Sequence, residues 1–495
     1  MIWLVLFSTG FVLPFARAQP YGLTSRPPIG PYLNNKVPSG APVAAGAWQT
    51  VKAFPNLTFA TPTFLVAEPN SNRLLVGGDQ GLIWVFDNNP SASTKNVYLD
   101  LRAHCQGYNG SGLLGLAFHP EYGKAGSPNR GFLYVSYQYT PGPVKGSPNA
   151  PPDHSTTPSY NRISRFWVQE GYTNADLSSE FVLINQFDRH LWHGGGAMFF
   201  GLDGFLYVTV GGEGGQADDY DQSQRIDLAL FGGVLRIDVD NNPSRSHPIR
   251  RQPRSATTPP AGWPATYSAG YSIPNDNPFL DPSGGILEEF WCIGLRSPHR
   301  MTQDPTTGQV WVGDVGNGGW EEIDLIRKGA NYQWPWREGD HPGFKPQPFS
   351  ITGVSTAPFY NYSHDKGNNC VIGGYVYRGS QFAAQLTGRY IFGDNISNRI
   401  WFLDPYGPPT QIFTELTTLP PGVEYIGGLS SFGLDRNNEL YMCTTGQTAS
   451  IYKLQYSGPP TPPLPPLLSQ TGAFSDVKSL TPATGVIPYT VNVPL

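Results

Sequence analysis

The sequence predicts an all-β fold, a six-bladed β-propeller, on three observations. The composition is rich in turn-forming and strand-forming residues, with 58 glycines, 49 prolines and 13% aromatic residues. Only 14% of the residues are charged, well below the ~25% of an average globular domain, so few segments suit long amphipathic helices. The third observation is a short apolar segment that recurs along the chain.

The recurring segment is the main evidence for the propeller. Each copy is apolar and contains β-branched or aromatic residues, and turn-forming residues precede it. The copies lie at 72–76, 131–135, 204–208, 308–312, 388–392 and 438–442. Six similar units favour six four-stranded blades around a channel, although a β-sandwich or two barrels would also contain many short strands. The uneven spacing predicts long loops, the longest near 241–278.

The two ends of the chain differ from this repeat. Residues 1–18 are interpreted as a signal peptide, because an apolar run too short to span a bilayer precedes the small-x-small sequence Ala16-Arg17-Ala18. The chain is therefore expected to be secreted or periplasmic. The remaining predicted parts are an extended segment at 19–47, the propeller at 48–457, a Pro-rich linker at 458–466, and a tail or the start of a further module at 467–495.

Charge and cysteine content exclude several classes of protein. A net charge of −5 without basic blocks argues against a nucleic-acid partner. No stretch after the signal peptide approaches ~20 apolar residues, so no membrane span is expected. Four cysteines without a CxxC pair argue against a zinc site, and one or two disulfides would suit an oxidising compartment, with the pairing left open.

Three motifs carry residues suited to chemistry. In His190-Leu-Trp-His193-Gly-Gly-Gly196, a histidine beside glycines can act as a general base, although a hydrogen-bonded loop histidine is the alternative. In 294–300, Arg296 can present its guanidinium to an anion, or form a salt bridge between blades. Segments 313–322 and 329–334 offer carboxylates and glycine-freed carbonyls, the oxygens that calcium prefers, but without EF-hand spacing.

Together, several motifs over residues 50–456 resemble one known family. They are 112–120, 193–196, 233–238, 294–298 and 321–332. Their order is similar to that of the soluble glucose/sorbosone dehydrogenase family, whose enzymes are six-bladed propellers that use pyrroloquinoline quinone (PQQ). The resemblance implies an aldose sugar dehydrogenase that oxidises a small-molecule sugar and passes electrons to a separate acceptor. The sugar, the acceptor and the oligomeric state stay open.

The resemblance also implies roles for individual residues. His193 would take the proton of the sugar C1 hydroxyl while hydride passes to PQQ, and Arg296 would stabilise the quinone oxygens. The main-chain carbonyls of Gly316 and Asn317 would hold a calcium ion on PQQ. Two further residues match ligands of a second, structural calcium: Glu322 and Tyr332.

This sequence departs from the family pattern at several positions. Ser297 stands where the cofactor-binding asparagine is usual, and Ser111 and Glu213 replace a glutamine and an aspartate. A cofactor-binding lysine is missing, with Arg399 as its substitute, and 422–429 lacks an arginine pair. PQQ carries three carboxylates, so each lost cation would cost about 1.5–3 kcal/mol of binding. These departures are similar to the hedgehog-interacting-protein-like branch and favour an alternative function, a non-catalytic secreted propeller that binds a protein or glycan.

Overall fold

The computed structural model describes most of the chain. The described residues are 47–107, 111–144, 157–404, 413–420, 428–458, 474–476, 479 and 481–483. Two compact units are present, residues 39–458 and residues 1–38 with 459–495. The predicted signal peptide, the N-terminal segment before residue 47, the linker after Gly458 and most of the C-terminal segment lie outside the described residues. In the second unit, β32 (Phe474–Asp476) pairs antiparallel with β33 (Thr481–Pro482).

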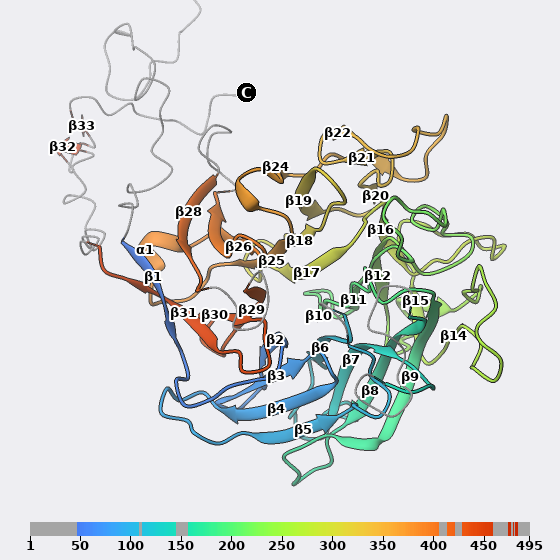
Figure 1. The fold of residues 1–495 in the computed structure, drawn as a ribbon, viewed down its shortest axis with the longest axis horizontal. Helices are drawn as coiled ribbons and strands as arrows, with labels where there is room; N and C mark the ends of the chain where they lie inside the picture. The colour runs from blue at the N-terminus through green and yellow to red at the C-terminus, as the bar shows by residue number, and fades with distance from the viewer. Residues whose placement is uncertain are drawn as a thin grey trace, which may run out of the picture. The chain divides into compact units, whose positions relative to one another are not determined.

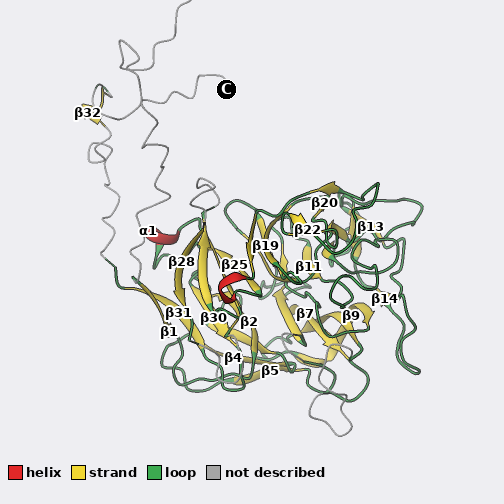
Figure 2. Ribbon diagram, turned by 45° about the horizontal axis from the view of Figure 1, so that its top comes forward, coloured by secondary structure: helices red, strands yellow, loops and turns green. Residues whose placement is uncertain are grey.

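The regular secondary structure described in the unit 39–458 is almost entirely β-strand, which confirms the all-β prediction. Its described helical residues form two short turns, α1 (Ala383–Leu386) and η2 (Asp365–Gly367) (Figure 2). No helix among the described residues is long and apolar enough to cross a membrane.

The strands form four-stranded antiparallel meanders. The first contains β2 (Pro62–Ala67), β3 (Arg73–Gly78), β4 (Leu82–Asp87) and β5 (Asn96–Asp100). The second contains β6 (Leu113–Phe118), β7 (Phe132–Tyr139), β8 (Ser159–Trp167) and β9 (Asp176–Asp188). The third contains β10 (Met198–Phe200), β11 (Leu206–Val210), β12 (Gly233–Ile237) and β16 (Phe290–Ile293).

The remaining meanders repeat this pattern. The fourth contains β17 (Pro298–Gln303), β18 (Val310–Asp314), β19 (Trp320–Ile326) and β24 (Tyr360–Ser363). The fifth contains β25 (Val371–Val376), β26 (Tyr390–Asp394), β27 (Arg399–Leu403) and β28 (Phe413–Thr418). The sixth contains β29 (Leu429–Leu434), β30 (Leu440–Thr444), β31 (Ile451–Tyr456) and β1 (Trp48–Lys52).

Short strands extend these sheets or form separate pairs. β14 (Tyr267–Ser268) extends the second meander, and β20 (Ala330–Asn331) and β23 (Val354–Ser355) extend the third. β13 (Ser246–Pro248) pairs with β15 (Ser272–Pro274), and β21 (Arg337–Glu338) pairs with β22 (His341–Pro342). The long loop predicted near 241–278 therefore contains β13, β14 and β15 and joins β12 to β16.

Each copy of the recurring segment begins one or two residues before the second strand of one meander and ends within it, namely β3, β7, β11, β18, β26 or β30. The last residue of each copy is fully buried: Val76, Val135, Val208, Val312, Phe392 and Met442. A strand covered on both faces is apolar at successive positions rather than at alternate ones. This explains why the second strands give the clearest signal in the sequence.

The first strands of the meanders lie around a common centre (Figure 1). Successive first strands contact each other in the order β2, β6, β10, β17, β25, β29, and β29 also contacts β2. The β29–β2 contact is a parallel pairing, Leu65 with Gly433 and Val66 with Leu434, which joins two meanders into one eight-stranded sheet.

The last meander is completed by the first strand of the described chain. β1 pairs antiparallel with β31, from Trp48 opposite Tyr456 to Lys52 opposite Tyr452. Trp48 is buried and packs on Phe382 and Tyr456, with ring centroids 5.0 and 4.7 Å away. Residues near the two ends of the unit are thus part of one sheet.

The four cysteines, Cys105, Cys292, Cys370 and Cys443, are all unpaired in this structure, so the disulfides considered from the sequence are not formed.

Candidate functional site

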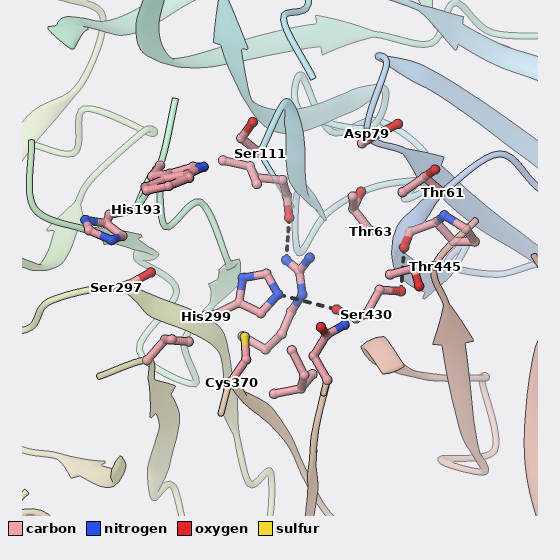
Figure 3. Close-up of a pocket in the computed structure, with 18 of the residues that line it drawn as sticks. Thr61, Thr63, Asp79, Ser111, His193, Ser297, His299, Cys370, Ser430 and Thr445 are labelled. Carbon is pink, nitrogen blue, oxygen red and sulfur yellow. Dashed lines mark hydrogen bonds between the residues drawn. The ribbon is translucent and has the colours of Figure 1, made fainter. Parts of the chain in front are cut away.

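A cavity of about 430 Å³ opens at one end of the first strands. Its wall is built from the beginnings of these strands and from the turns that follow the second strands, so every meander contributes residues. Figure 3 shows His193, Ser111, Ser297, His299 and Ser430 around this space. The volume lies within the ~300–1,000 Å³ typical of small-molecule sites.

His193 is half-buried in the cavity wall. No hydrogen bond joins its imidazole to another described residue. Burial lowers the pKa of His193 well below its ordinary value, and the positive charges of Arg296 and His190 lower it further. The ring is therefore uncharged at neutral pH and can accept a proton from a bound hydroxyl.

The glycines after His193 are required by close backbone packing. A Cβ on Gly195 would lie 2.7 Å from the carbonyl oxygen of Thr209 in β11, and a Cβ on Gly196 would lie 2.5 Å from Cβ of Leu114 in β6. Both glycines also have positive φ angles, 66° and 82°, which favour glycine. The glycine run thus lets the backbone pass between two meanders and fixes His193 at the cavity.

The guanidinium of Arg296 is surrounded by protein oxygens. Its Nη1 donates to the carbonyl oxygens of Val315 and Gly316 at 3.0 and 2.6 Å. Its Nη2 donates to Oδ1 of Asn317 at 3.0 Å and, like Nε, to the carbonyl oxygen of Gln216. These contacts use all five N–H groups of the side chain. Arg296 therefore clamps the 315–317 loop in this structure.

A carboxylate holds the same loop from its other side. Oε1 of Glu338 accepts from the backbone N–H groups of Asn317, Gly318 and Gly319 at 2.6, 2.8 and 3.2 Å. The loop also requires a glycine at position 316. A Cβ on Gly316 would collide with the carbonyl oxygen of Trp320. The loop is thus fixed by one positive and one negative side chain of the protein itself.

These contacts do not fit PQQ with calcium. The carbonyl of Gly316, which the resemblance assigns to calcium, already accepts from Arg296, and a second cation at that oxygen would be repelled by the guanidinium. Arg296 also keeps no N–H for a quinone oxygen. Among the described residues of the cavity wall, Arg300 alone is a Lys or Arg, against three carboxylates of PQQ.

The other two predicted cofactor residues differ in position. Ser297 lines the cavity, and its backbone N–H donates to Oδ1 of Asp314 at 2.6 Å. Arg399 in β27 is not part of the cavity wall. Its Nη1 donates to Oδ1 of Asn368 at 3.1 Å, and its Nε lies 3.7 Å from Oε2 of Glu415. Most of the stretch 422–429 lies outside the described residues.

Three buried carboxylates, those of Asp314, Glu322 and Asp324, form a separate cluster. One oxygen of each lies within 4.8 Å of the others. Burial raises the pKa of each, and their mutual repulsion raises those of Glu322 and Asp324 further. Both side-chain oxygens of Asp324 are buried with no hydrogen-bond partner among the described residues. Uncompensated buried carboxylates are costly, and hard oxygens suit calcium, so this cluster fits a bound cation.

The cluster changes the ligand set that the resemblance implies. Glu322 is part of it, but the phenol of Tyr332 is occupied: it donates to the carbonyl oxygen of Leu325 at 2.7 Å and accepts from the N–H of Arg327 at 3.0 Å. Asp324 was not selected from the sequence. Its spacing of two from Glu322 was the available signal, because residues i and i+2 share a face of a strand.

Two cavity residues missed by the sequence reasoning are His299 and Arg300. Consecutive residues of a regular strand point to opposite faces, so only one would be expected to face the centre. The pairing of β17 with β18 is irregular between Pro298 and Met301, and Arg300 has a φ of 71°. This bulge lets both residues line the cavity. No sequence pattern predicts the bulge.

Comparison with known proteins gives the family. The model described as Glucose / Sorbosone dehydrogenase matches residues 59–271 and 266–404. The chain is 26% identical over 445 residues to the HIPL2 protein of Arabidopsis thaliana, covering 79% of this chain and 61% of that protein. It is 28% identical over 396 residues to human Hedgehog-interacting protein, covering 76% and 47%. The chain thus spans about half to three fifths of the length of these relatives.

A solved structure supports the propeller fold. The soluble aldose sugar dehydrogenase of Escherichia coli in the apo-form matches with a TM-score of 0.55 at 18% identity, covering 83% of this chain and 99% of that one. At this identity the likeness concerns the fold alone. The family model, however, covers well over half of the chain, and this chain belongs to the glucose/sorbosone dehydrogenase family.

Proposed function

We propose that this chain is a sugar-binding propeller and that the sugar occupies the cavity beside His193. The observation that carries the proposal is the neutral imidazole of His193, which has no hydrogen bond to a described residue and lies in a wall with neutral polar groups. Ser297 and Asn395 belong to this wall, and Trp192 adds an aromatic ring. Sugar hydroxyls both donate and accept hydrogen bonds, so hydroxyl, amide and neutral imidazole groups match them.

A six-bladed arrangement is part of this proposal. Six meanders whose first strands contact each other in turn support six blades around a channel. The sugar site would then lie at one mouth of the channel, and residues 48–457 would form the propeller.

Export and a structural cation complete the proposal. A signal peptide at 1–18 would send the protein out of the cytoplasm, and N-terminal sequencing of the mature chain is expected to begin at Gln19. Calcium would occupy the carboxylates of Asp314, Glu322 and Asp324, where it would neutralise buried charge rather than take part in chemistry.

Sugar oxidation is the second candidate function. The uncharged ring of His193 favours it, because a neutral imidazole can remove the proton of the C1 hydroxyl. Oxidation also requires an acceptor for two electrons. PQQ with calcium does not fit the described residues while Arg296 holds the carbonyl of Gly316, so sugar binding without oxidation is better supported.

Calorimetric titration of the full chain with neutral aldoses tests the proposal. Replacing His193→Asn should weaken binding about tenfold, through loss of one or two hydrogen bonds of ~1 kcal/mol each. His104→Asn is the matched control, because His104 lies outside the cavity wall and bonds the carbonyl oxygen of Thr140. Absence of binding by every sugar, neutral or acidic, would refute the proposal. Sugar-dependent reduction of a dye in the presence of PQQ and calcium, lost in His193→Asn, would establish oxidation instead.

A further inference from the structure

Arg300 is a buried cation without a counter-ion among the described residues. Its side chain lines the cavity, and the residue is 7% exposed. One hydrogen bond holds the guanidinium, from Nη1 to the carbonyl oxygen of Leu114 at 2.7 Å. Nε is buried without an acceptor, and no carboxylate among the described residues forms a salt bridge with this side chain. Most of its five N–H groups are therefore without a protein acceptor.

Among the described residues, two of the other three buried arginines are paired with carboxylates, and the third, Arg296, is hydrogen-bonded through all five of its N–H groups. Nη2 of Arg236 lies 2.9 Å from Asp203, and its Nη1 lies 2.7 Å from Asp276. Arg162 bonds the side chain of Asn185 and lies 3.6 Å from Glu180. Buried charges in proteins are normally paired in this way. Arg300 departs from this rule in the wall of the cavity, where a ligand could supply the missing partner.

The fold holds Arg300 there despite an unfavourable backbone. Its φ of 71° lies in the left-handed region, which side chains other than Asn and Asp rarely adopt. Gly373 of the next meander packs against its carbonyl oxygen so closely that a Cβ would collide. Backbone strain of this kind is concentrated at ligand-binding and catalytic sites.

Among the described residues, no charged group is in contact with Arg300. Burial lowers the pKa of Arg300 to about 10, so it remains a cation at neutral pH, and no carboxylate contributes to this shift. Burial and the nearby charge of Arg300 lower the pKa of His299 to about 3, so that ring is neutral. The carboxylate in the same wall, Asp79, lies beside Thr61 and away from His299 (Figure 3).

We propose that the sugar bound in the cavity is a sugar acid, a hexuronate whose carboxylate pairs with the guanidinium of Arg300. A carboxylate can accept two parallel N–H bonds from an arginine, and the neutral hydroxyls of the same molecule would face His193 and Ser297. One unpaired cation matches one negative charge, so a monoanion is favoured over a phosphate dianion or a tricarboxylate. This inference rests on the proposed sugar site.

The test compares charged and neutral sugars that differ at C6 alone. The full chain is titrated by calorimetry with D-glucuronate, its methyl ester, D-glucose, glucose 6-sulfate and PQQ. We expect glucuronate to bind at least tenfold more tightly than glucose or the ester, with affinity falling as salt rises. In Arg300→Met this preference for glucuronate over glucose should disappear. Arg102→Met, at an exposed arginine paired with Asp100, should behave as the unaltered protein.

A second measurement guards against loss of folding. Removing an unpaired buried charge should leave the melting temperature of the ligand-free Arg300→Met protein unchanged or raised, and glucuronate should no longer raise it. Equal affinity for glucuronate and glucose would overturn the inference while leaving the sugar site intact, whereas no sugar binding at all would overturn the proposed function. Preference for glucose 6-sulfate would reject the carboxylate, and Arg300-dependent binding of PQQ would reject a sugar acid as the ligand.

Discussion

Arg296 and Arg300 lie four residues apart at the start of β17, and both are almost completely buried, yet their surroundings are opposite. Arg296 donates to four protein groups and holds a loop together. Arg300 donates to one carbonyl, and no described residue pairs with its charge. A buried arginine can therefore be part of the scaffold or part of a binding site, and the number of its satisfied donors distinguishes the two roles.

Replacing Arg296 is the strongest test of the difference between the two arginines. Arg296→Met would leave the carbonyls of the half-buried residues Val315 and Gly316 without this donor, at about 1–2 kcal/mol each. We expect the free energy of unfolding, measured by urea denaturation, to fall by roughly 2–4 kcal/mol through the loss of these hydrogen bonds. Arg300→Met should show no such loss. Similar stability of the two variants would contradict the division into scaffold and site.

Calcium removal tests the carboxylate cluster next to Arg296. Asp314 accepts the backbone N–H groups of Arg296 and Ser297 and also belongs to the carboxylate cluster. Calcium at a hundred times its dissociation constant should stabilise the fold by about 2.7 kcal/mol, and EDTA should reverse this. Asp324→Asn should reduce the response, measured as a shift in melting temperature. An exposed aspartate variant, Asp227→Asn, serves as control, and a calcium response equal in both variants would remove Asp324 from the site.

The pH dependence of stability tests the surroundings of Arg300. The pKa of His299 is lowered to about 3, first by burial and then by Arg300. Unfolded His299 takes up a proton near pH 6.5, while folded His299 stays neutral. Protonation therefore favours the unfolded chain, so the folded state is fully stable with respect to His299 above pH 6.5 and loses stability as pH falls below it. The loss should reach about 2 kcal/mol at pH 5. His299→Gln should flatten the pH dependence by this amount relative to His104→Gln, and an unchanged slope would place His299 in contact with solvent.

The sequence indicates the strands and the motif residues, but not the contacts that their side chains make. The second strands, such as that ending at Val76, were visible because both faces are covered and the strand is apolar throughout. His193 was visible because three glycines mark the close backbone packing beside it. The bulge that turns Arg300 inward depends on pairing between β17 and β18 and has no local signature. For the same reason, sequence alone could not distinguish an Arg296 aimed at a ligand from one aimed at its own loop.

The pairing of β1 with β31 has a consequence for synthesis of the chain. Trp48 and Tyr456 are separated by about 400 residues. At ~5–20 residues per second, ribosomes need about 20–80 s to synthesise the chain between the two strands. During this time β1 has no β31 to pair with, while the other meanders form. An unpaired edge strand is a hazard for association with other chains. The polar residues of β1, Gln49, Thr50 and Lys52, suit a strand that must stay dissociated until the rest of the unit exists.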